Sequence, residues 1–315
     1  MVTLPAEGGA AARPQRRLRL GRQARTRLLL TALMVPALLC TGVLVAWPIA
    51  KLIQISFYEL RLAELMRPIV KPWTLANYAA AIGHPGFLPS LGATAIFVFA
   101  GTAAALAMGL ATALLLDLRL AGSALFQALI VSPWSVAPAI ASLIWMFLLN
   151  DQFGLVNYLL LATGVVASPV PFLTSPDVAI WAVTFAAAWK SYPFFTVMLL
   201  AGLQSIPRSL HEAAMMDGAG RLRRFRAITL PGLAGFLRVT VFLGLLSAFR
   251  NVESVLVMTG GGPARSTETL AVRVYAETFQ FLSPGRGAAL GVLTLGVAVA
   301  TTLAFLWAGR RRARS

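Results

Sequence analysis

The chain is poor in the residues that usually cover the surface of a soluble protein. Only 12% of its 315 residues are charged, against roughly a quarter in typical soluble domains. Its one cysteine, Cys40, excludes a disulfide within the chain. One cysteine and two histidines also provide no cluster of the kind that holds a metal ion.

Lysine is scarce as well, because the chain has three and none of them follows a glycine. This excludes the phosphate-binding loop Gly-x-x-x-x-Gly-Lys-Ser/Thr, so Gly260-Gly261-Gly262 is predicted to form a tight turn instead. No Gly-x-Ser-x-Gly element is present either. We therefore expect a non-catalytic chain without cofactor or metal, whose energy source is borrowed from elsewhere.

Apolar residues are abundant, at 58%, and they gather in runs rather than in the alternation of a soluble core. A helix crosses the hydrocarbon core of a bilayer with about 20 residues. Six runs are long enough: Leu28–Ala50, Pro89–Leu116, Leu120–Leu149, Val178–Leu203, Phe236–Met258 and Ala288–Ala308. The sequence therefore predicts an all-α, polytopic membrane protein with six transmembrane helices.

The first run also resembles a secretory signal peptide, because an arginine-rich stretch precedes it. A signal peptide has an apolar region of about 7–15 residues that ends at a small-x-small cleavage site. This run is longer and reaches Trp47-Pro48-Ile49 without such a site. We expect it to be an uncleaved span, preceded by a disordered tail at residues 1–27.

The net charge of +16 suggests nucleic-acid binding at first sight, but the basic residues flank the apolar runs. Eighteen of them lie in one set of segments and six in the alternate loops. The richer set is 1–27, 117–124, 204–238 and 309–315, and the poorer set is 57–90, 150–177 and 259–287. Because basic residues favour the cytoplasmic side, both termini are predicted to be cytoplasmic, with no nucleic-acid partner. The membrane domain then spans 28–310, and 311–315 is a basic tail.

The segment 204–233 is unusually polar for a stretch between two apolar runs. It contains HEAAMMDGAGRLRRFRAITLPGL, with four arginines and two acidic residues. Its composition predicts a short helix over Leu210–Asp217 that ends at Gly218. A second, basic amphipathic helix is expected over Arg221–Leu230, ending at Pro231-Gly232.

Lipid headgroups alone explain the arginines of the second helix, but they do not explain the first helix. That helix presents small alanines, two methionines and acidic side chains, a surface suited to a protein groove. Ser209-x-x-Glu212 also matches a capping box, which is the alternative role for Glu212. The sharper hypothesis is that Glu212 meets an arginine of a partner.

A resemblance to a known family rests on several motifs in order. Glu212-Ala213-Ala214, Asp217-Gly218-Ala219 and Ile228-x-Leu230-Pro231 resemble the cytoplasmic "EAA" loop of membrane subunits of binding-protein-dependent ABC importers. The branch similar to the maltose and glycerol-3-phosphate permeases is indicated by further motifs. These are Ser132-Pro133-Trp134 with Trp145, Trp189-Lys190 with Pro193-Phe194, Leu203-Gln204-Ser205-Ile206-Pro207, and Thr259-Gly260-Gly261-Gly262-Pro263 with Thr267-Glu268-Thr269-Leu270. The resemblance covers about Leu28 to Arg310.

This resemblance implies an ABC importer type I permease fold in a bacterial or archaeal cytoplasmic membrane, surrounded by membrane lipids. It implies a second similar permease, two ABC ATPase subunits and an extracytoplasmic solute-binding protein as partners, and a sugar as substrate. It also implies that one set of residues docks on the ATPase: Glu212, Ala213, Ala214, Asp217 and Gly218. The chain departs from the pattern at Glu253, where many relatives have aspartate.

Ionisable residues inside a span are costly and mark functional pathways by default. Lys190 lies midway along the fourth run, and Arg250 and Glu253 are expected on one face of the fifth. An ion pair among these three is the structural alternative. The functional hypothesis is a central cavity suited to a polyol, lined by Trp189, Lys190, Tyr192, Arg250, Asn251 and Glu253.

Other classes remain open from the residues alone. An ion-coupled secondary transporter needs intramembrane acids and often an inverted repeat, whereas Glu253 is the one deep acid and no repeat is seen. A scaffold without transport, or an ABC permease for an amino acid or polyamine, fits the motifs less well.

Overall fold

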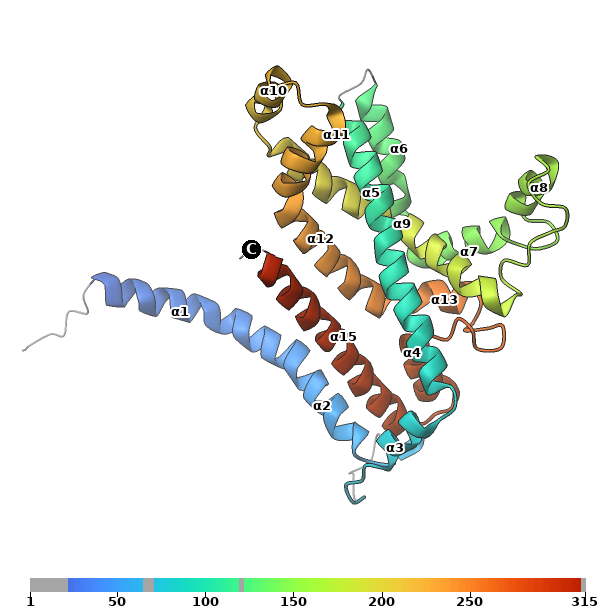
Figure 1. The fold of residues 1–315 in the computed structure, drawn as a ribbon. Helices are drawn as coiled ribbons and strands as arrows, with labels where there is room; N and C mark the ends of the chain where they lie inside the picture. The colour runs from blue at the N-terminus through green and yellow to red at the C-terminus, as the bar shows by residue number, and fades with distance from the viewer. Residues whose placement is uncertain (1–21, 65–70, 119–121, 313–315) are drawn as a thin grey trace, which may run out of the picture. The chain divides into compact units, whose positions relative to one another are not determined.

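A computed structural model describes residues 22–64, 71–118 and 122–312, and every regular element in those ranges is helical (Figure 1). Residues 1–51 and 52–315 form separate compact units. The first unit contains α1 (Arg22–Thr41), a π-helical turn (Gly42–Ala46) and the beginning of α2 (Trp47–Ser56). Arg22 to Arg27, expected in the disordered tail, are thus helical, and the rest of that tail lies outside the described residues.

The second unit begins with the end of α2 and contains the remaining helices. They are α3 (Ala76–Gly83), α4 (Phe87–Ala95), α5 (Gly101–Asp117), α6 (Ser123–Ser135), α7 (Pro138–Leu148), α8 (Leu155–Ala162), α9 (Pro176–Gln204), α10 (Arg208–Met216), α11 (Arg221–Arg224), α12 (Leu230–Arg250), α13 (Glu253–Met258), α14 (Leu270–Tyr275) and α15 (Pro284–Arg312). Short π-helical turns at Ile96–Ala100 and Phe225–Thr229 join α4 to α5 and α11 to α12.

Five described helices are long and apolar enough to cross a membrane, or six if one bent pair counts as a single span. The five are Leu33–Ser56, Phe87–Asp117, Pro176–Gln204, Arg221–Arg250 and Pro284–Gly309. They correspond to five of the six predicted runs. The bent pair is α6 and α7, which meet at an angle of 99°.

The third run, Leu120–Leu149, is therefore not one straight helix as expected. Val136 and Ala137 have extended backbones, with ψ of 137° and 139°. Pro138 explains this break, because a proline pushes the preceding residue out of helical geometry and cannot donate a backbone hydrogen bond.

The fifth run also differs from the prediction at both ends. Pro231-Gly232 does not end a helix, since helical backbone runs from Arg221 to Arg250. The π-helical turn Phe225–Thr229 lies just before Pro231, and such a turn is a common way to accommodate a proline's missing donor. At the other end α12 stops at Arg250, and Glu253 begins a separate helix. Arg250 and Glu253 are thus not on consecutive turns of one helix.

The centre of the second unit is α9, which packs along α5 and also contacts α12, α6 and α7. Its Phe195 is 1% exposed and lies between glycines of two neighbours, Gly109 of α5 and Gly244 of α12. Thr112 of α5 and Thr196 of α9 share a hydroxyl hydrogen bond of 2.7 Å beside this ring. Small residues let these helices approach closely, which is the usual packing of helices in membranes.

Candidate functional site

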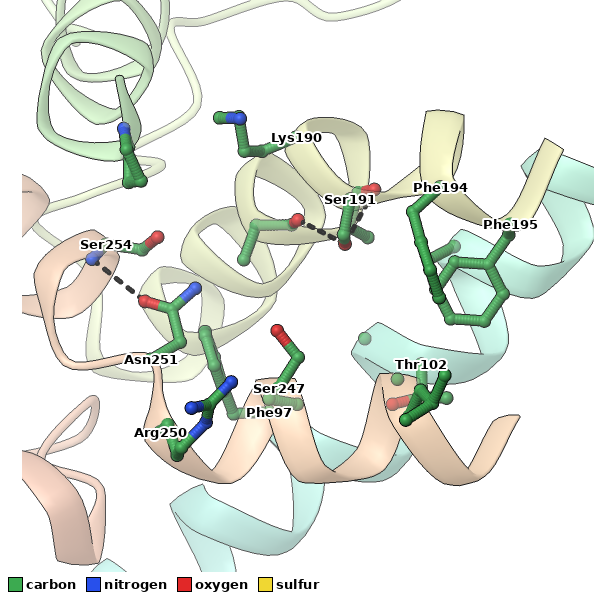
Figure 2. A pocket seen from close by; sticks show the side chains of 18 of the residues that line it. Phe97, Thr102, Lys190, Ser191, Phe194, Phe195, Ser247, Arg250, Asn251 and Ser254 are labelled. Atoms are coloured by element: carbon green, nitrogen blue, oxygen red, sulfur yellow. Dashed lines mark hydrogen bonds between the residues drawn. The ribbon is translucent and has the colours of Figure 1, made fainter. Parts of the chain in front are cut away.

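A cavity of about 640 Å³ lies among α5, α6, α7, α9, α12 and α13 (Figure 2). It is at the point where α6 breaks from α7 and where α12 ends before α13. Its walls include Trp134 at the end of α6 and Pro138 at the start of α7. Broken helices that line a cavity at membrane depth are typical of transporter substrate sites, and the volume is in the range of small-molecule sites.

Lys190 lies midway along α9, and its side chain contacts the end of α6, where the third run is broken. Its Nζ donates a hydrogen bond of 2.9 Å to the backbone carbonyl of Trp134. That carbonyl lies in the last turn of α6, where helical carbonyls lack partners within the helix and carry partial negative charge. The lysine therefore stabilises the broken end of α6.

The two ion pairs considered from the sequence, Lys190–Glu253 and Arg250–Glu253, are not formed. The ion pairs among the described residues are Lys71–Glu64 and Arg265–Glu268, both away from the cavity. The structural alternative for these intramembrane charges is thus wrong in that form, because Lys190 pairs with a backbone carbonyl instead.

We expect Lys190→Met to lower both thermal stability and transport, because it leaves the Trp134 carbonyl without its charged donor. A hydrogen bond to a charged group contributes about 1.5–3 kcal/mol. Lys190→Arg, which keeps a charged donor, is the matched control and should retain most of both. Melting curves of the purified protein and uptake assays measure the two effects. Wild-type melting and wild-type uptake by Lys190→Met would contradict this role.

Four of the six residues predicted for the cavity line it: Lys190, Arg250, Asn251 and Glu253. Trp189 and Tyr192 do not. Trp189 packs edge-on against Trp145 with ring centroids 5.5 Å apart, and Tyr192 packs in the cluster around Phe195. The reason is helical periodicity, because Ala187, Lys190, Ser191 and Phe194 share the cavity face of α9.

Several wall residues were not predicted, among them Trp134, Ser191, Phe194 and Ser247. Counting four residues forward from Lys190 would have found Phe194, and counting three back would have found Ala187, from which four residues forward is Ser191. The break at Pro138 could have pointed to Trp134. Asn251 has a local task as well, since its Oδ1 accepts a hydrogen bond of 3.1 Å from the Ser254 amide and so caps the start of α13.

The polar segment 204–233 forms the exposed helix α10 followed by a sharp reversal. Gly218 has φ of +75°, the left-handed conformation expected from the sequence. Its amide donates a hydrogen bond of 3.0 Å to the Met215 carbonyl, and the Ala219 amide donates one of 2.8 Å to the Ala214 carbonyl. These two bonds form a Schellman motif that satisfies the last carbonyls of α10.

The residues of α10 and of the turn after it that were predicted to meet a partner are accessible. Glu212, Ala213, Asp217 and Gly218 are exposed and Ala214 is partly exposed. Leu210 and the two methionines are also exposed, Met216 by 89%. The capping box is not formed, because Pro207 occupies the cap position and no side chain caps this helix.

Gly218→Val is expected to impair coupling through backbone strain alone, because no atom lies within 4 Å of the position a Cβ would take. Left-handed geometry costs a non-glycine residue about 1–2 kcal/mol, and a β-branched one more. Gly218→Asn should be milder, since asparagine tolerates this conformation. Gly220→Val is the matched control, because Gly220 has φ of −64° and equal space. Equal uptake by Gly218→Val and Gly220→Val would refute the argument.

The glycine run is a closed turn, as predicted. Gly260 and Gly261 have φ of +61° and +93°. Thr259 and Thr267 share a hydroxyl hydrogen bond of 2.8 Å, and Thr267 donates to the Gly262 carbonyl at 2.7 Å. These bonds close the turn, while the buried Ser266 hydroxyl within it has no partner among the described residues.

Comparison with known proteins identifies the family. Residues 106–314 match the model of the binding-protein-dependent transport system inner membrane component family. The chain belongs to this family. It is therefore a membrane permease component and not an ATPase, in agreement with the resemblance of its motifs.

Individual relatives are similar over most of their length. The trehalose/maltose transport system permease protein MalF of Thermococcus litoralis is 36% identical over 77% of this chain and 81% of its own. The sulfoquinovosyl glycerol transport system permease protein SmoG of Agrobacterium fabrum is 34% identical over 89% of this chain and 90% of its own. The sn-glycerol-3-phosphate transport system permease protein UgpA of Brucella abortus is 34% identical over 86% of this chain and 90% of its own.

Solved structures show the same fold. A bacterial ABC transporter involved in the import of the acidic polysaccharide alginate matches 92% of this chain and 97% of its own, with a TM-score of 0.72 and 20% identity. The alginate transporter in complex with its alginate pentasaccharide-bound periplasmic protein matches 94% and 99%, with a TM-score of 0.77 and 20% identity. The chain thus has the fold of an ABC importer permease.

Proposed function

We propose that this chain is one permease subunit of an ATP-driven importer that moves a sugar or sugar derivative into the cytoplasm. The observation that carries the proposal is the cavity between two broken helices, which offers hydroxyl, amide and aromatic groups to a polyol. Relatives named for maltose, sulfoquinovosyl glycerol and glycerol phosphate transport support a carbohydrate-like substrate.

In this proposal the membrane domain spans 28–310 with six crossings and both termini in the cytoplasm. The helices α6 and α7 have 13 and 11 residues, too few for either to cross alone, so the bent pair counts as one span. Six crossings return the chain to its starting side. This agrees with the basic residues of both terminal segments, 1–27 and 311–315.

The proposed assembly contains a second similar permease, two ABC ATPase subunits and an extracytoplasmic solute-binding protein, in a bacterial or archaeal cytoplasmic membrane. The loop 204–233 transmits nucleotide-driven closure to the spans. Its contact set is Glu212, Ala213, Ala214, Asp217 and Gly218. An exposed helix with methionines and small side chains suits insertion into a groove of the ATPase.

The test is uptake of a labelled sugar by proteoliposomes that contain the complete transporter, co-purified through a tag on this chain. Uptake should require ATP on the ATPase side and the binding protein on the other. Uptake by this chain alone, driven by a sodium or proton gradient, would overturn the proposal in favour of an ion-coupled carrier.

A further inference from the structure

The cavity carries an unbalanced charge. Three ionisable side chains of the described part of the chain line it: Lys190, Arg250 and Glu253. Two positive charges and one negative charge leave one positive charge in excess. Such an excess at membrane depth is costly unless an acceptor or an anion compensates it.

Two charged side chains of this wall have no ion-pair partner among the described residues, the basic Arg250 and the acidic Glu253. Lys190 already donates to the Trp134 carbonyl at 2.9 Å. Within the described residues, the Arg250 guanidinium has neither a hydrogen-bond acceptor nor an ion-pair partner. Arg250 is exposed, so its five N–H donors are open to water and to the oxygen atoms of a ligand that enters the cavity.

Glu253 is the acidic group of the described cavity wall, and it forms no ion pair with Arg250. The other polar groups around Arg250 add few acceptors. Figure 2 shows Ser247, Arg250 and Asn251 on one side of the cavity, with Lys190 and Ser191 on the other. The Oδ1 of Asn251 is engaged by the Ser254 amide at 3.1 Å. The Asn251 amide nitrogen is thus left as a donor beside a donor-only guanidinium. A neutral sugar would meet this wall with hydroxyls, whereas an anionic group would match it in charge and in geometry.

We propose that Arg250 binds an anionic substituent of the transported sugar: a carboxylate, phosphate or sulfonate group. This rests on the proposed function and narrows its substrate class to acidic sugars and sugar esters. Arg250 is then a specificity-determining residue. Ser247, Ser191 and the Asn251 amide contact the hydroxyls of the same ligand.

The test uses a matched pair of ligands, glucuronate and glucose, which differ by a carboxylate in place of a hydroxymethyl group. Their binding to the complete transporter in nanodiscs, without the binding protein, is measured by equilibrium dialysis at millimolar concentrations. This removes the binding protein's own selectivity. Glucuronate should bind about tenfold more tightly than glucose, since a charge-assisted hydrogen bond contributes at least the corresponding free energy.

Variants assign this preference to Arg250. Arg250→Gln should abolish the preference, and Arg250→Lys should keep part of it, because the charge remains but the planar fork is lost. The control is Arg238→Gln on the same helix, which lies off the cavity and donates to its own helix at the Ala234 carbonyl. It should leave the preference unchanged.

Two results overturn the inference. One is equal binding of the two sugars or no binding of either, and the other is an unchanged preference in Arg250→Gln. ATP-dependent uptake of a neutral sugar, unaffected by Arg250→Gln, would reject the inference while the proposed function stands. Absence of ATP-dependent uptake of any sugar, neutral or acidic, would reject the proposed function itself.

Discussion

Glu212→Lys is expected to reduce ATP-dependent uptake at least tenfold while leaving the chain inserted in the membrane. Glu212 is exposed on α10 and has no ion-pair partner among the described residues. The helix that carries it buries none of its side chains within this chain, so the fold does not depend on the substitution. If Glu212 meets an arginine of the ATPase, a lysine replaces an attraction with a repulsion, which costs several kcal/mol at an interface.

Co-purification of the ATPase with the tagged permease and uptake into proteoliposomes measure this effect. Glu59→Lys makes the same change of charge at an exposed residue of the loop 57–90, and it should preserve both ATPase retention and uptake. Glu212→Gln should lie between the wild type and Glu212→Lys, because it removes the attraction without adding repulsion. Full ATPase retention with full uptake in Glu212→Lys would disprove the assignment of this helix to coupling.

Features that depend on neighbouring residues were predictable from the sequence. Five of the six apolar runs correspond to long helices, because hydropathy over about 20 residues reports directly on membrane insertion. The left-handed Gly218 followed from a helix-forming stretch that ends at a glycine. In both cases the decisive information lies within a few turns of chain.

The errors arose where hydropathy could not detect a change of direction. The runs Leu120–Leu149 and Phe236–Met258 are apolar enough on average to be taken as single helices, yet each is interrupted, at Val136-Ala137 and at Asn251-Val252. Pro138 was a local signal for the first break. The second break has no proline or glycine, but the side chain of Asn251 there accepts the Ser254 amide, which favours a new helix start over continuation of α12.

The cavity was predictable only in part, because its walls come from segments far apart in the chain. Lys190 and Trp134 are 56 residues apart and meet through one hydrogen bond. Treating Trp189, Lys190 and Tyr192 as one group ignored that successive helical residues point in different directions. The charge of Lys190 identified the region, whereas packing of the helices determined which of its neighbours line the cavity.

The packing of Phe195 was also invisible in the sequence, and it gives the largest expected effect on stability. A Cβ at Gly244 would lie 2.4 Å from Cζ of Phe195, and one at Gly109 would lie 2.4 Å from its Cβ. Phe195 is 1% exposed, so the ring has little room to move away. The contact joins α5, α9 and α12, the three helices on which the cavity is built.

Gly244→Val is therefore expected to destabilise the protein by about 3 kcal/mol, the upper part of the usual range for an overpacked core. Gly235→Val is the matched control, because Gly235 is on the same helix with no atom within 4 Å of an added Cβ. Thermal unfolding in detergent measures both variants. Combining Gly244→Val with Phe195→Leu, which removes the far end of the ring, should recover more stability than the two single effects predict when added. If Gly244→Val and Gly235→Val have the same melting temperature, the Phe195 ring is not confined as described. If the double variant is simply additive, the clash lies elsewhere on α12.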